Sequence, residues 1–437
     1  MKKGIVVIFA CILTILMIGC EFRTVDKMYS PPERSADHNS LQSVINEAMA
    51  NLQYCAPASG ENQQLVQMTD LDGDNQQECL LFAKGGEQRP LNILIFTQQN
   101  DAYVHSHTIE LVGSSFDKVE YAQMDGRPGM EVIVGSQVSD RLSRSVSVYS
   151  FYGGDAEHLV TADYLNFQCV DLNANGLSDL FVLRSGPTDN DRGIVELFSY
   201  ASGGVERSVE LSLSETADRR KRISVGRLHG GEPAVYIACA VDEDTLITDV
   251  YSVINGEFTN VSLSVESNTS NQTMRNYFVY ADNMDNDNAM ELPRLVPTRP
   301  IDMAWQESGD ELIAWYSITA AGEEIIKLYT YHNFIGGWYV QFDKQTAENI
   351  SVVNIGNNFD FYFWDGDAAV KVFSIVAFTG QNRETQGSAD GYFPLHRTES
   401  TVYSAKLDDS AEEFSFTKDF VVRSFHVIHE HWNTGET

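Results

Sequence analysis

A nine-residue acidic loop recurs along this chain and constrains its fold more than any other feature. The first copy is Asp70–Glu78, and the apolar run Cys79–Ala83 follows it directly. A second copy, Asp171–Asp179, keeps an oxygen-bearing side chain at its first, third, fifth and ninth positions and precedes the apolar run Leu180–Leu183. A third copy spans Asn283–Glu291. Self-similarity of this kind indicates a repeat architecture, whose units must stack to bury their apolar faces.

Two weaker copies complete the series. One covers 123–131 and precedes a predicted strand at 132–135; the other lies around 227–232 and precedes a predicted strand at 234–240. First loop positions at residues 70, 123, 171, 227 and 283 are separated by 53, 48, 56 and 56 residues. That period suits a four-stranded propeller blade of about 40 to 50 residues. Runs of period two, such as Val146–Phe151, exclude helical repeats.

We therefore predict a mainly β fold, a β-propeller of about 50-residue repeats over 46–345. A C-terminal α+β unit over 346–437 should follow it and end in a helix. Thr417 is the expected N-cap of that helix, and its apolar face should carry Val421, Phe425, Ile428 and Trp432. A shorter helix over 41–52 should precede the first blade.

The repeating oxygen positions predict bound calcium. Ca²⁺ takes six to eight oxygen ligands, and carboxylates on alternate residues of a tight loop converge on one point. Gly73 should permit the sharp turn. The predicted metal ligands are Asp70, Asp72, Asp74, Gln76 and Glu78; Asp171, Asn173, Asn175 and Asp179; and Asn283, Asp285, Asp287 and Glu291. Arg127 would place a cation inside the 123 loop, which is excluded. The alternative is that these residues only favour turns.

These loops resemble the calcium loop D-x-D-x-D-G-x-x-D/E of the FG-GAP and VCBS repeats of integrin-type β-propellers. The resemblance covers about residues 46–300 by motif, and the whole chain is similar to VCBS-repeat lipoproteins of Gram-positive anaerobic bacteria. It implies a surface-attached propeller that binds a partner or acts as a scaffold, with calcium in a structural role. The degraded loops at 123 and 227 depart from the pattern.

The N-terminus predicts export and lipidation. Basic residues at 2 and 3 precede the apolar run Ile5–Ile18 and the pair Gly19–Cys20. Because the run is shorter than the roughly 20 residues of a membrane span, we expect a signal peptide over 1–19 and an acylated Cys20. Residues 20–45 should form a flexible tether. Plain secretion and a retained anchor are the alternatives. The protein should therefore be anchored by lipid to the extracytoplasmic face of the cell membrane.

Charge limits the class of partner. The formal net charge is −32, and removal of Lys2 and Lys3 with the signal peptide makes it −34. A surface of this sign disfavours nucleic acid and anionic lipid and favours cations, neutral sugars or basic partners. We expect two kinds of partner: the membrane, through lipid on Cys20, and a glycan, peptide or protein ligand.

Other candidate sites in the sequence are weaker. No C-x-x-C motif occurs, and a disulfide between Cys55 and Cys79 competes with buried free thiols. Exposed tryptophans could stack on sugar rings, although large aromatic residues are usually core. These tryptophans are Trp305, Trp315, Trp338, Trp364 and Trp432. Three histidines near the C-terminus, at 426, 429 and 431, lack the spacing of a zinc motif.

Two classes of function follow. The first is a non-catalytic surface lipoprotein whose calcium-stabilised propeller binds an extracellular glycan, peptide or protein. It is favoured because no nucleophile-elbow, phosphate-loop or dinucleotide motif occurs, so that no enzyme is expected. The alternative is an extracellular enzyme acting on polysaccharide or cell wall.

Overall fold

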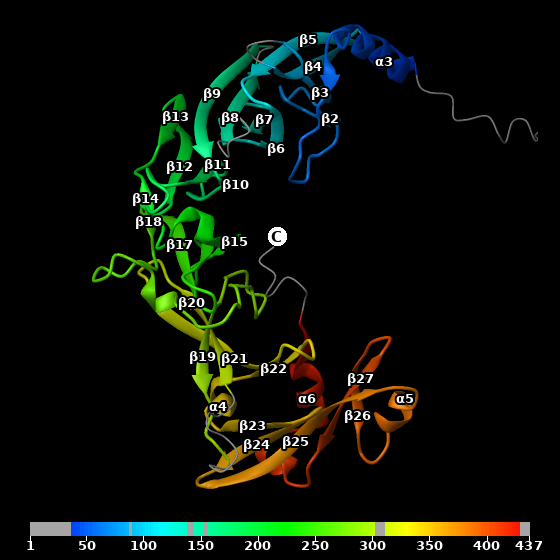
Figure 1. Cartoon of the computed structure of the whole chain (residues 1–437), viewed down its shortest axis with the longest axis vertical. Coiled ribbons are helices and arrows are strands. Elements are labelled where there is room, and N and C mark those ends of the chain that lie inside the picture. Colours follow the sequence, from blue (N-terminus) through cyan, green and yellow to red (C-terminus); the bar gives the residue numbers. More distant parts are fainter. Residues whose placement is uncertain are drawn as a thin grey trace, which may run out of the picture.

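Six antiparallel sheets follow one another along an open arc (Figure 1). The computed structural model describes residues 36–86, 90–100, 102–137, 144–152, 155–301 and 311–428. The chain is mainly β, as predicted from its sequence. The predicted signal peptide, Cys20 and the tether up to residue 35 lie outside the described residues. Within the described ranges, no helix has both the length and the apolar character needed to cross a membrane.

Each of the first three sheets contains a four-stranded antiparallel meander. The first contains β1 (Gln53–Tyr54), β2 (Val66–Thr69), β3 (Glu78–Lys84), β4 (Leu91–Gln99) and β5 (Ala102–Leu111). The second contains β6 (Ser115–Ala122), β7 (Glu131–Gln137), β8 (Arg144–Tyr152) and β9 (Asp155–Tyr164). The third contains β10 (Asn166–Val170), β11 (Asp179–Arg184), β12 (Ile194–Ala201), β13 (Gly204–Arg207) and β14 (Leu211–Ser212). Outside the meanders, β1 is added beside β3 in the first sheet and β14 beside β12 in the third.

The remaining sheets continue the arc. The fourth contains β15 (Arg220–Arg227), β16 (Pro233–Ala240), β17 (Leu246–Ile254) and β18 (Glu257–Asn260). The fifth contains β19 (Leu292–Pro297), β20 (Glu311–Ile318), β21 (Glu324–Asn333), β22 (Trp338–Phe342) and β28 (Phe425–Val427). The sixth contains β23 (Ile350–Ile355), β24 (Asn358–Asp365), β25 (Ala368–Thr379), β26 (Phe393–Arg397) and β27 (Thr401–Leu407).

Helices are few and short. The α-helices are α3 (Ala36–Ala48), α4 (Lys344–Ala347), α5 (Arg383–Gln386) and α6 (Lys418–Ser424), and the 3₁₀ turns are η1 (Ala217–Arg219), η2 (Asn271–Thr273) and η3 (Ala411–Phe414). The predicted helix over 41–52 corresponds to α3. Ile45 of α3 packs on Leu81 and Phe96 of the first sheet. Because a terminal repeat has no neighbour on one side, α3 covers the apolar face that would otherwise meet water.

In the first four repeats the loop connects an outer strand to the next strand of the same sheet: β2 to β3, β6 to β7, β10 to β11 and β15 to β16. The 283 loop leads into β19, the first strand of the fifth sheet. The apolar run after each of the first four loops is the second strand of its pair, and β3, β7, β11 and β16 are buried along almost their whole length. Strands covered on both faces carry continuous apolar runs and not alternating ones. The predicted strands after the first four loops are therefore confirmed.

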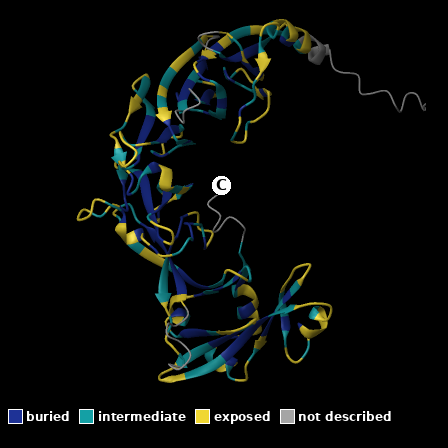
Figure 2. Ribbon diagram, viewed as in Figure 1, coloured by how far each residue is buried: buried dark blue, intermediate teal, exposed yellow. Residues whose placement is uncertain are grey.

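Hydrophobic cores lie between consecutive sheets. Phe82 of β3, for example, meets Phe116 of β6 edge to face at 5.2 Å between ring centroids. Separate clusters join the first sheet to the second, the second to the third, and so on to the sixth. Buried residues accordingly occupy the interior of every sheet (Figure 2). Among the described residues, no such cluster joins the first sheet to the sixth, so each sheet is stabilised mainly by its neighbours.

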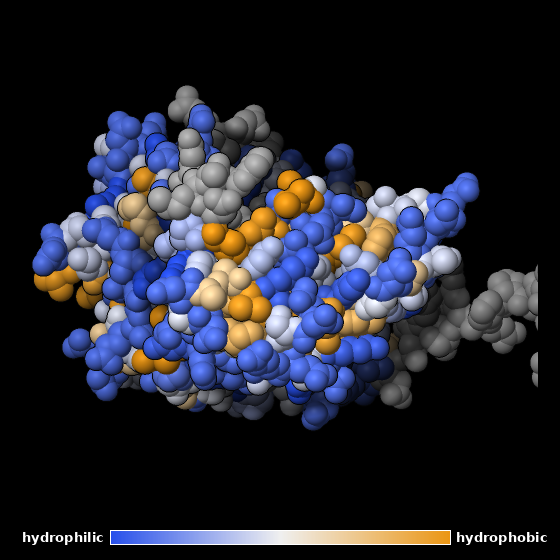
Figure 3. Space-filling model, turned by 90° about the horizontal axis from the view of Figure 1, so that it is seen from below, coloured by the Kyte–Doolittle hydropathy of each residue, from blue (hydrophilic) through white to orange (hydrophobic). Residues whose placement is uncertain are grey.

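A closed propeller is not confirmed. The first and the sixth sheet lie at the two ends of the arc and leave its side open in Figure 1. A ring would bring the first and last blades together and protect both outer faces. Here α3 covers one end. The outer surface seen from below in Figure 3 is mostly hydrophilic, with small hydrophobic patches.

The predicted C-terminal helix is wrong beyond Ser424. Thr417 is its N-cap, as expected, and accepts a hydrogen bond from the Phe420 amide at 3.1 Å. After Ser424 the chain becomes β28, which pairs with β22 in the fifth sheet. Phe425 and Val427 thus satisfy an open sheet edge, a tertiary contact that outweighs their helical spacing. Trp432 lies outside the described residues.

Candidate metal centre

Four of the five loops share one structural hydrogen bond. The acid at position nine accepts from the backbone amide at position two in the loops beginning at 70, 123, 171 and 283. The four pairs are Glu78 with Leu71, Glu131 with Met124, Asp179 with Leu172, and Glu291 with Met284, at 2.8, 2.5, 3.0 and 2.8 Å. Because this bond persists in the 123 loop, the ninth acid closes the turn whether or not a metal is present.

Hydrogen bonds also join the loops of adjacent sheets. The amide at position eight of one loop donates to the position-one carbonyl of the preceding loop. Met130 donates to Asp70 at 3.2 Å, Ser178 to Gln123 at 2.7 Å, and Met290 to Arg227 at 2.9 Å. The loops therefore lie along one edge of the arc and hold its sheets in register.

The backbone of the three acidic loops repeats in detail. Position four is left-handed in the 70, 171 and 283 loops, at Gly73 (φ 77°), Ala174 (φ 58°) and Asn286 (φ 61°). Position six is left-handed too, at Asn75 (φ 67°), Gly176 (φ 87°) and Asn288 (φ 74°). Glycine and asparagine adopt this conformation at low cost. Gly73 is required for a second reason, since a Cβ there would lie 2.3 Å from Cβ of Pro128.

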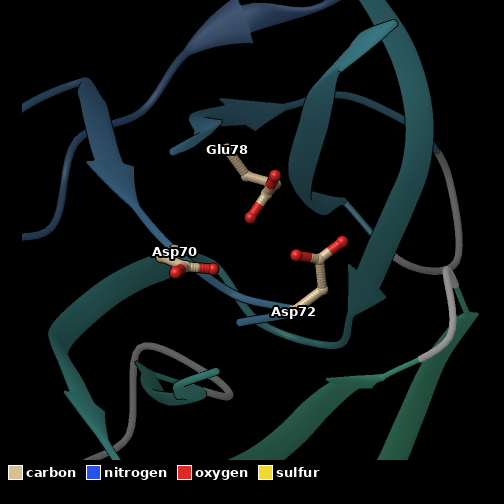
Figure 4. Close-up of side chains that lie close together, drawn as sticks. All are labelled: Asp70, Asp72 and Glu78. Atoms are coloured by element: carbon tan, nitrogen blue, oxygen red, sulfur yellow. The ribbon is translucent and has the colours of Figure 1, made fainter. Parts of the chain in front are cut away.

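The 70 loop brings three carboxylates together. Oxygens of Asp70, Asp72 and Glu78 lie within 4.8 Å of one another, and the three side chains point toward a common space (Figure 4). Asp74 and Gln76 stand apart from this group, because the Asp74 carboxylate accepts from the Gln76 amide at 2.7 Å and from its side chain at 3.0 Å. Three of the five predicted ligands therefore converge.

Burial makes these carboxylates costly to ionise without a cation. The Glu78 side chain is buried, and burial together with the negative charges of Asp72, Asp74 and Asp70 raises its pKa to about 7. Burial likewise raises the pKa of Asp72. Hard oxygen anions crowded in a partly dry loop are the environment that a divalent cation stabilises.

The 283 loop forms the second group of converging acids. Oxygens of Asp285, Asp287 and Glu291 lie within 4.8 Å of one another. Glu291 is completely buried, and burial raises its pKa to about 7. Its Oε1 and the Oδ1 of Asn283 are buried without a hydrogen-bond partner. A bound cation would give these two buried acceptors a partner, and an unpaired buried polar atom is otherwise costly.

The 123 loop contains a cation of its own. Asp125 is buried, and its Oδ2 accepts from Arg127 Nε at 2.7 Å and from Ser150 Oγ at 2.7 Å. Arg127 also pairs with Glu157 of β9 at 2.9 Å. Although burial opposes the change, these hydrogen bonds hold the pKa of Asp125 below its usual value. The guanidinium balances the charge of Asp125, so Arg127 places its cation inside the 123 loop as expected, while the exclusion of a metal there remains a prediction.

Neither of the two remaining loops brings three carboxylates together. In the 171 loop, Asn173 Nδ2 donates to Asp179 Oδ1 at 3.0 Å, which occupies the carboxylate oxygen that would face an ion. With two acids only, this loop gathers fewer charges than the other acidic loops, and its metal remains a prediction. The 227 loop is a short turn in which the Leu228 amide donates to the Glu232 carbonyl at 2.8 Å.

A polar groove lies between the outer strands of the first two sheets, and it was not predicted from the sequence. Its larger part has a volume of about 750 Å³ and lies between β5 and the β8–β9 hairpin; its smaller part, of about 520 Å³, is a separate hollow between residues 104–107 of β5 and the 70 loop. Hydroxyl, imidazole and carboxylate groups line it, among them Thr108, Ser147, His158 and Asp163. No sequence motif could have identified these four residues, because they lie on three different strands, β5, β8 and β9.

The other candidates from the sequence are structural. Trp315 and Trp338 are buried in the fifth sheet, and Trp364 is covered by the Arg299 guanidinium at 3.9 Å, so these three offer no open sugar platform. His426 stacks on Tyr339, while His429, His431 and Trp305 lie outside the described residues. All four cysteines in the described part of the chain are free thiols, namely Cys55, Cys79, Cys169 and Cys239.

No protein-family model and no curated protein matches the sequence. Solved structures do match at low identity. Rhamnogalacturonan lyase PL11 of Bacillus licheniformis is 11% identical over 74% of this chain, with a TM-score of 0.34, and the chain spans 60% of its length. The exotype rhamnogalacturonan lyase YesX is 12% identical, with 82% and 75% of the two chains covered and a TM-score of 0.28. A Lactobacillus plantarum protein is 10% identical, with 74% and 95% covered and a TM-score of 0.26.

These matches correct the expectation that the protein is not an enzyme. That expectation rested on absent catalytic motifs, yet the matched lyases are enzymes and align with 74% or more of this chain. The exclusion of catalysis is therefore withdrawn. Identities of 10 to 12% and TM-scores of 0.26 to 0.34 assign neither a family nor a reaction to this chain.

Proposed function

We propose that the protein is a calcium-binding, extracytoplasmic β-repeat protein that is attached to the membrane through lipid on Cys20 and binds an extracellular glycan. Its sheets would be blades of an open propeller of the VCBS and FG-GAP type. The observation that carries the calcium assignment is the convergence of three carboxylates in each of the 70 and 283 loops. Calcium prefers such oxygen ligands and tolerates their irregular geometry.

The glycan is proposed from the groove between the first two sheets. Donors and acceptors line it on β5, β7, β8 and β9, and a hydroxyl-rich chain offers the complementary groups. Glu110 and Asp163 lie in the larger part, so a neutral sugar chain fits better than an anionic one.

A glycan array with the purified chain tests the binding, and His158→Ala is the informative variant. His158 is exposed in the groove, where its Nε2 lies 2.7 Å from Thr161 Oγ1. Its removal should weaken binding severalfold, whereas His396→Ala, at an exposed position in the sixth sheet, should have no effect. Binding to no glycan, or equal loss in both variants, would contradict the assignment. Turnover of a polysaccharide in the same screen would identify an enzyme.

Mass spectrometry of the membrane fraction tests the anchor. The wild-type chain should carry acyl groups on Cys20, and Cys20→Ala should lose them and be released to the medium. One chain holds a protein at the bilayer only reversibly, so at least two are expected. Unchanged membrane retention of Cys20→Ala would count against lipidation.

A further inference from the structure

A lysine from a distant strand faces the 283 loop. Lys327 Nζ pairs with Asp287 and lies 3.6 Å from Oδ2 of Asp285, and its side chain is 17% exposed. The 283 loop leads into β19, whereas Lys327 belongs to β21, two strands away in the same sheet. The contact is therefore made across the sheet and not along the chain.

Lys327 owes its direction to a β-bulge. Trp315 of β20 pairs with Leu328 and Tyr316 pairs with Ile326, so Lys327 is the extra residue between them. A bulge leaves one residue outside the ladder and changes the direction of its side chain. The fifth sheet thus uses an irregularity to aim a cation at its own acidic loop.

The first sheet has a bulge at the matching place. Ile95 of β4 pairs with His107 and Phe96 pairs with His105, which leaves Ser106 as the extra residue of β5. Ser106 lines the smaller part of the groove together with Asp72 and Glu78 of the 70 loop. Among the described residues, no lysine or arginine forms an ion pair with the acids of the 70 loop. The Ser106 hydroxyl donates to the Ile95 carbonyl at 3.0 Å, so the position that brings an ammonium to the 283 loop brings no charge to the 70 loop.

The 283 loop retains the features of a metal site despite this lysine. Lys327 meets the acids at positions three and five, while the Oε1 of buried Glu291 and the Oδ1 of Asn283 stay without partners. The ammonium therefore neutralises only part of the loop. A divalent ion that used the two free oxygens would have to compete with Lys327 for Asp285 and Asp287.

We propose that the bulge residue sets the calcium affinity of its loop, so that Lys327 makes the 283 loop a weak site and Ser106 leaves the 70 loop a strong one. The inference rests on the proposed calcium binding. A nearby positive charge disfavours a second cation, and the ion pair must loosen before the metal gains its full set of oxygens. The chain would then fill its loops in two steps as calcium rises.

Calorimetric titration of the full chain with calcium chloride alone tests the inference. The wild-type chain should show a strong and a weak event. Lys327→Ser should strengthen the weak event by at least about tenfold and leave the strong event unchanged. The reciprocal Ser106→Lys should weaken the strong event by a similar factor. Lys327→Arg should behave as the wild type, because it keeps the charge.

Two controls separate the outcomes. Lys371→Met removes an ion pair with Asp360 in the sixth sheet and should leave both events unchanged. Glu291→Gln should abolish the weak event and so identify its loop. An unchanged weak event in Lys327→Ser, or a strong event without any weak one in every variant, overturns this inference alone. The absence of calcium binding in every variant overturns the proposed function and this inference together.

Discussion

The 70 and 123 loops occupy the same place in adjacent sheets, yet they balance their negative charge in different ways. Both close the turn with a ninth-position acid on a second-position amide, and they are hydrogen-bonded to each other. The 70 loop leaves three carboxylates facing one another, whereas the 123 loop fills the corresponding space with the Arg127 guanidinium. The repeat therefore specifies the turn, and the charge is balanced separately in each copy.

Position six marks the same divide in the backbone. The acidic loops are left-handed there, at Asn75 in the first copy, while the 123 loop has Pro128. The proline ring fixes φ near −65°, so this loop cannot adopt the backbone of its acidic counterparts. Loss of the converging carboxylates and loss of the left-handed conformation at position six occur together in one copy.

The largest expected effect is the loss of Arg127. Arg127→Ala leaves the buried Asp125 carboxylate without its cation and should reduce the free energy of unfolding by about 3 kcal/mol. Urea unfolding would measure the loss. The matched control is Arg397→Ala, whose partner Glu384 is exposed, and it should cost less than about 1 kcal/mol. Equal losses would mean that Arg127 is only a surface ion pair.

The next effect is a pH dependence of stability that comes from the buried acids of the 70 and 283 loops. In the calcium-free folded chain the pKa values of Glu78 and Glu291 are about 7, above the ordinary 4.5. The folded state then holds extra protons between pH 4.5 and 7, so stability is full below this window and is lost as pH rises through it. Calcium needs the ionised carboxylates, so its affinity should fall up to about tenfold per pH unit below 7.

Melting curves at pH 5 and pH 8, with calcium and with chelator, measure this effect. Calcium should raise the melting temperature at pH 8 and have little effect at pH 5. Without calcium, the melting temperature should be higher at pH 5 than at pH 8, because Glu78 and Glu291 are ionised in the folded chain at pH 8. A calcium effect of equal size at both pH values would contradict the role given to Glu78 and Glu291.

The smallest expected effect is a calcium response gained by the 123 loop. Arg127→Asp combined with Pro128→Asn restores an acid at position five and a residue that adopts the left-handed conformation at position six. This double variant should acquire a calcium-dependent rise in melting temperature of a few degrees. Arg127→Asp alone should not, because Pro128 still fixes the backbone. No calcium response in the double variant would show that these two positions do not decide metal binding.

Much of the repeat was predictable from the sequence because its determinants are local. The loops, the apolar strands that follow the first four of them and the place of Arg127 inside the 123 loop follow from residues within about ten positions of one another, as does the Thr417 cap. The open arc was not predictable, since closure depends on how the first and last sheets meet. The end of α6 at Ser424 depends on the free edge of β22, which no helical spacing reveals.

The charge around the loops was predictable only in part. Arg127 lies inside its loop and could be recognised directly. Lys327 lies 40 residues from Asp287, and only the β20–β21 bulge brings the two together. The groove between the first two sheets has the same origin, because residues of β5, β8 and β9 line it. Contacts across a sheet must be seen in the structure.

The most direct test compares calcium binding by the wild-type chain with that of two matched aspartate variants. Asp72→Ala removes a converging ligand from the 70 loop, and Asp125→Ala removes the equivalent acid from the 123 loop. Calcium at a hundredfold over its Kd should stabilise the wild type by about 2.7 kcal/mol. The account predicts that Asp125→Ala retains this calcium response, measured by melting and by titration, and that Asp72→Ala loses most of it. Identical melting curves with calcium and with chelator in the wild type would contradict it, because these acids would then be turn residues alone.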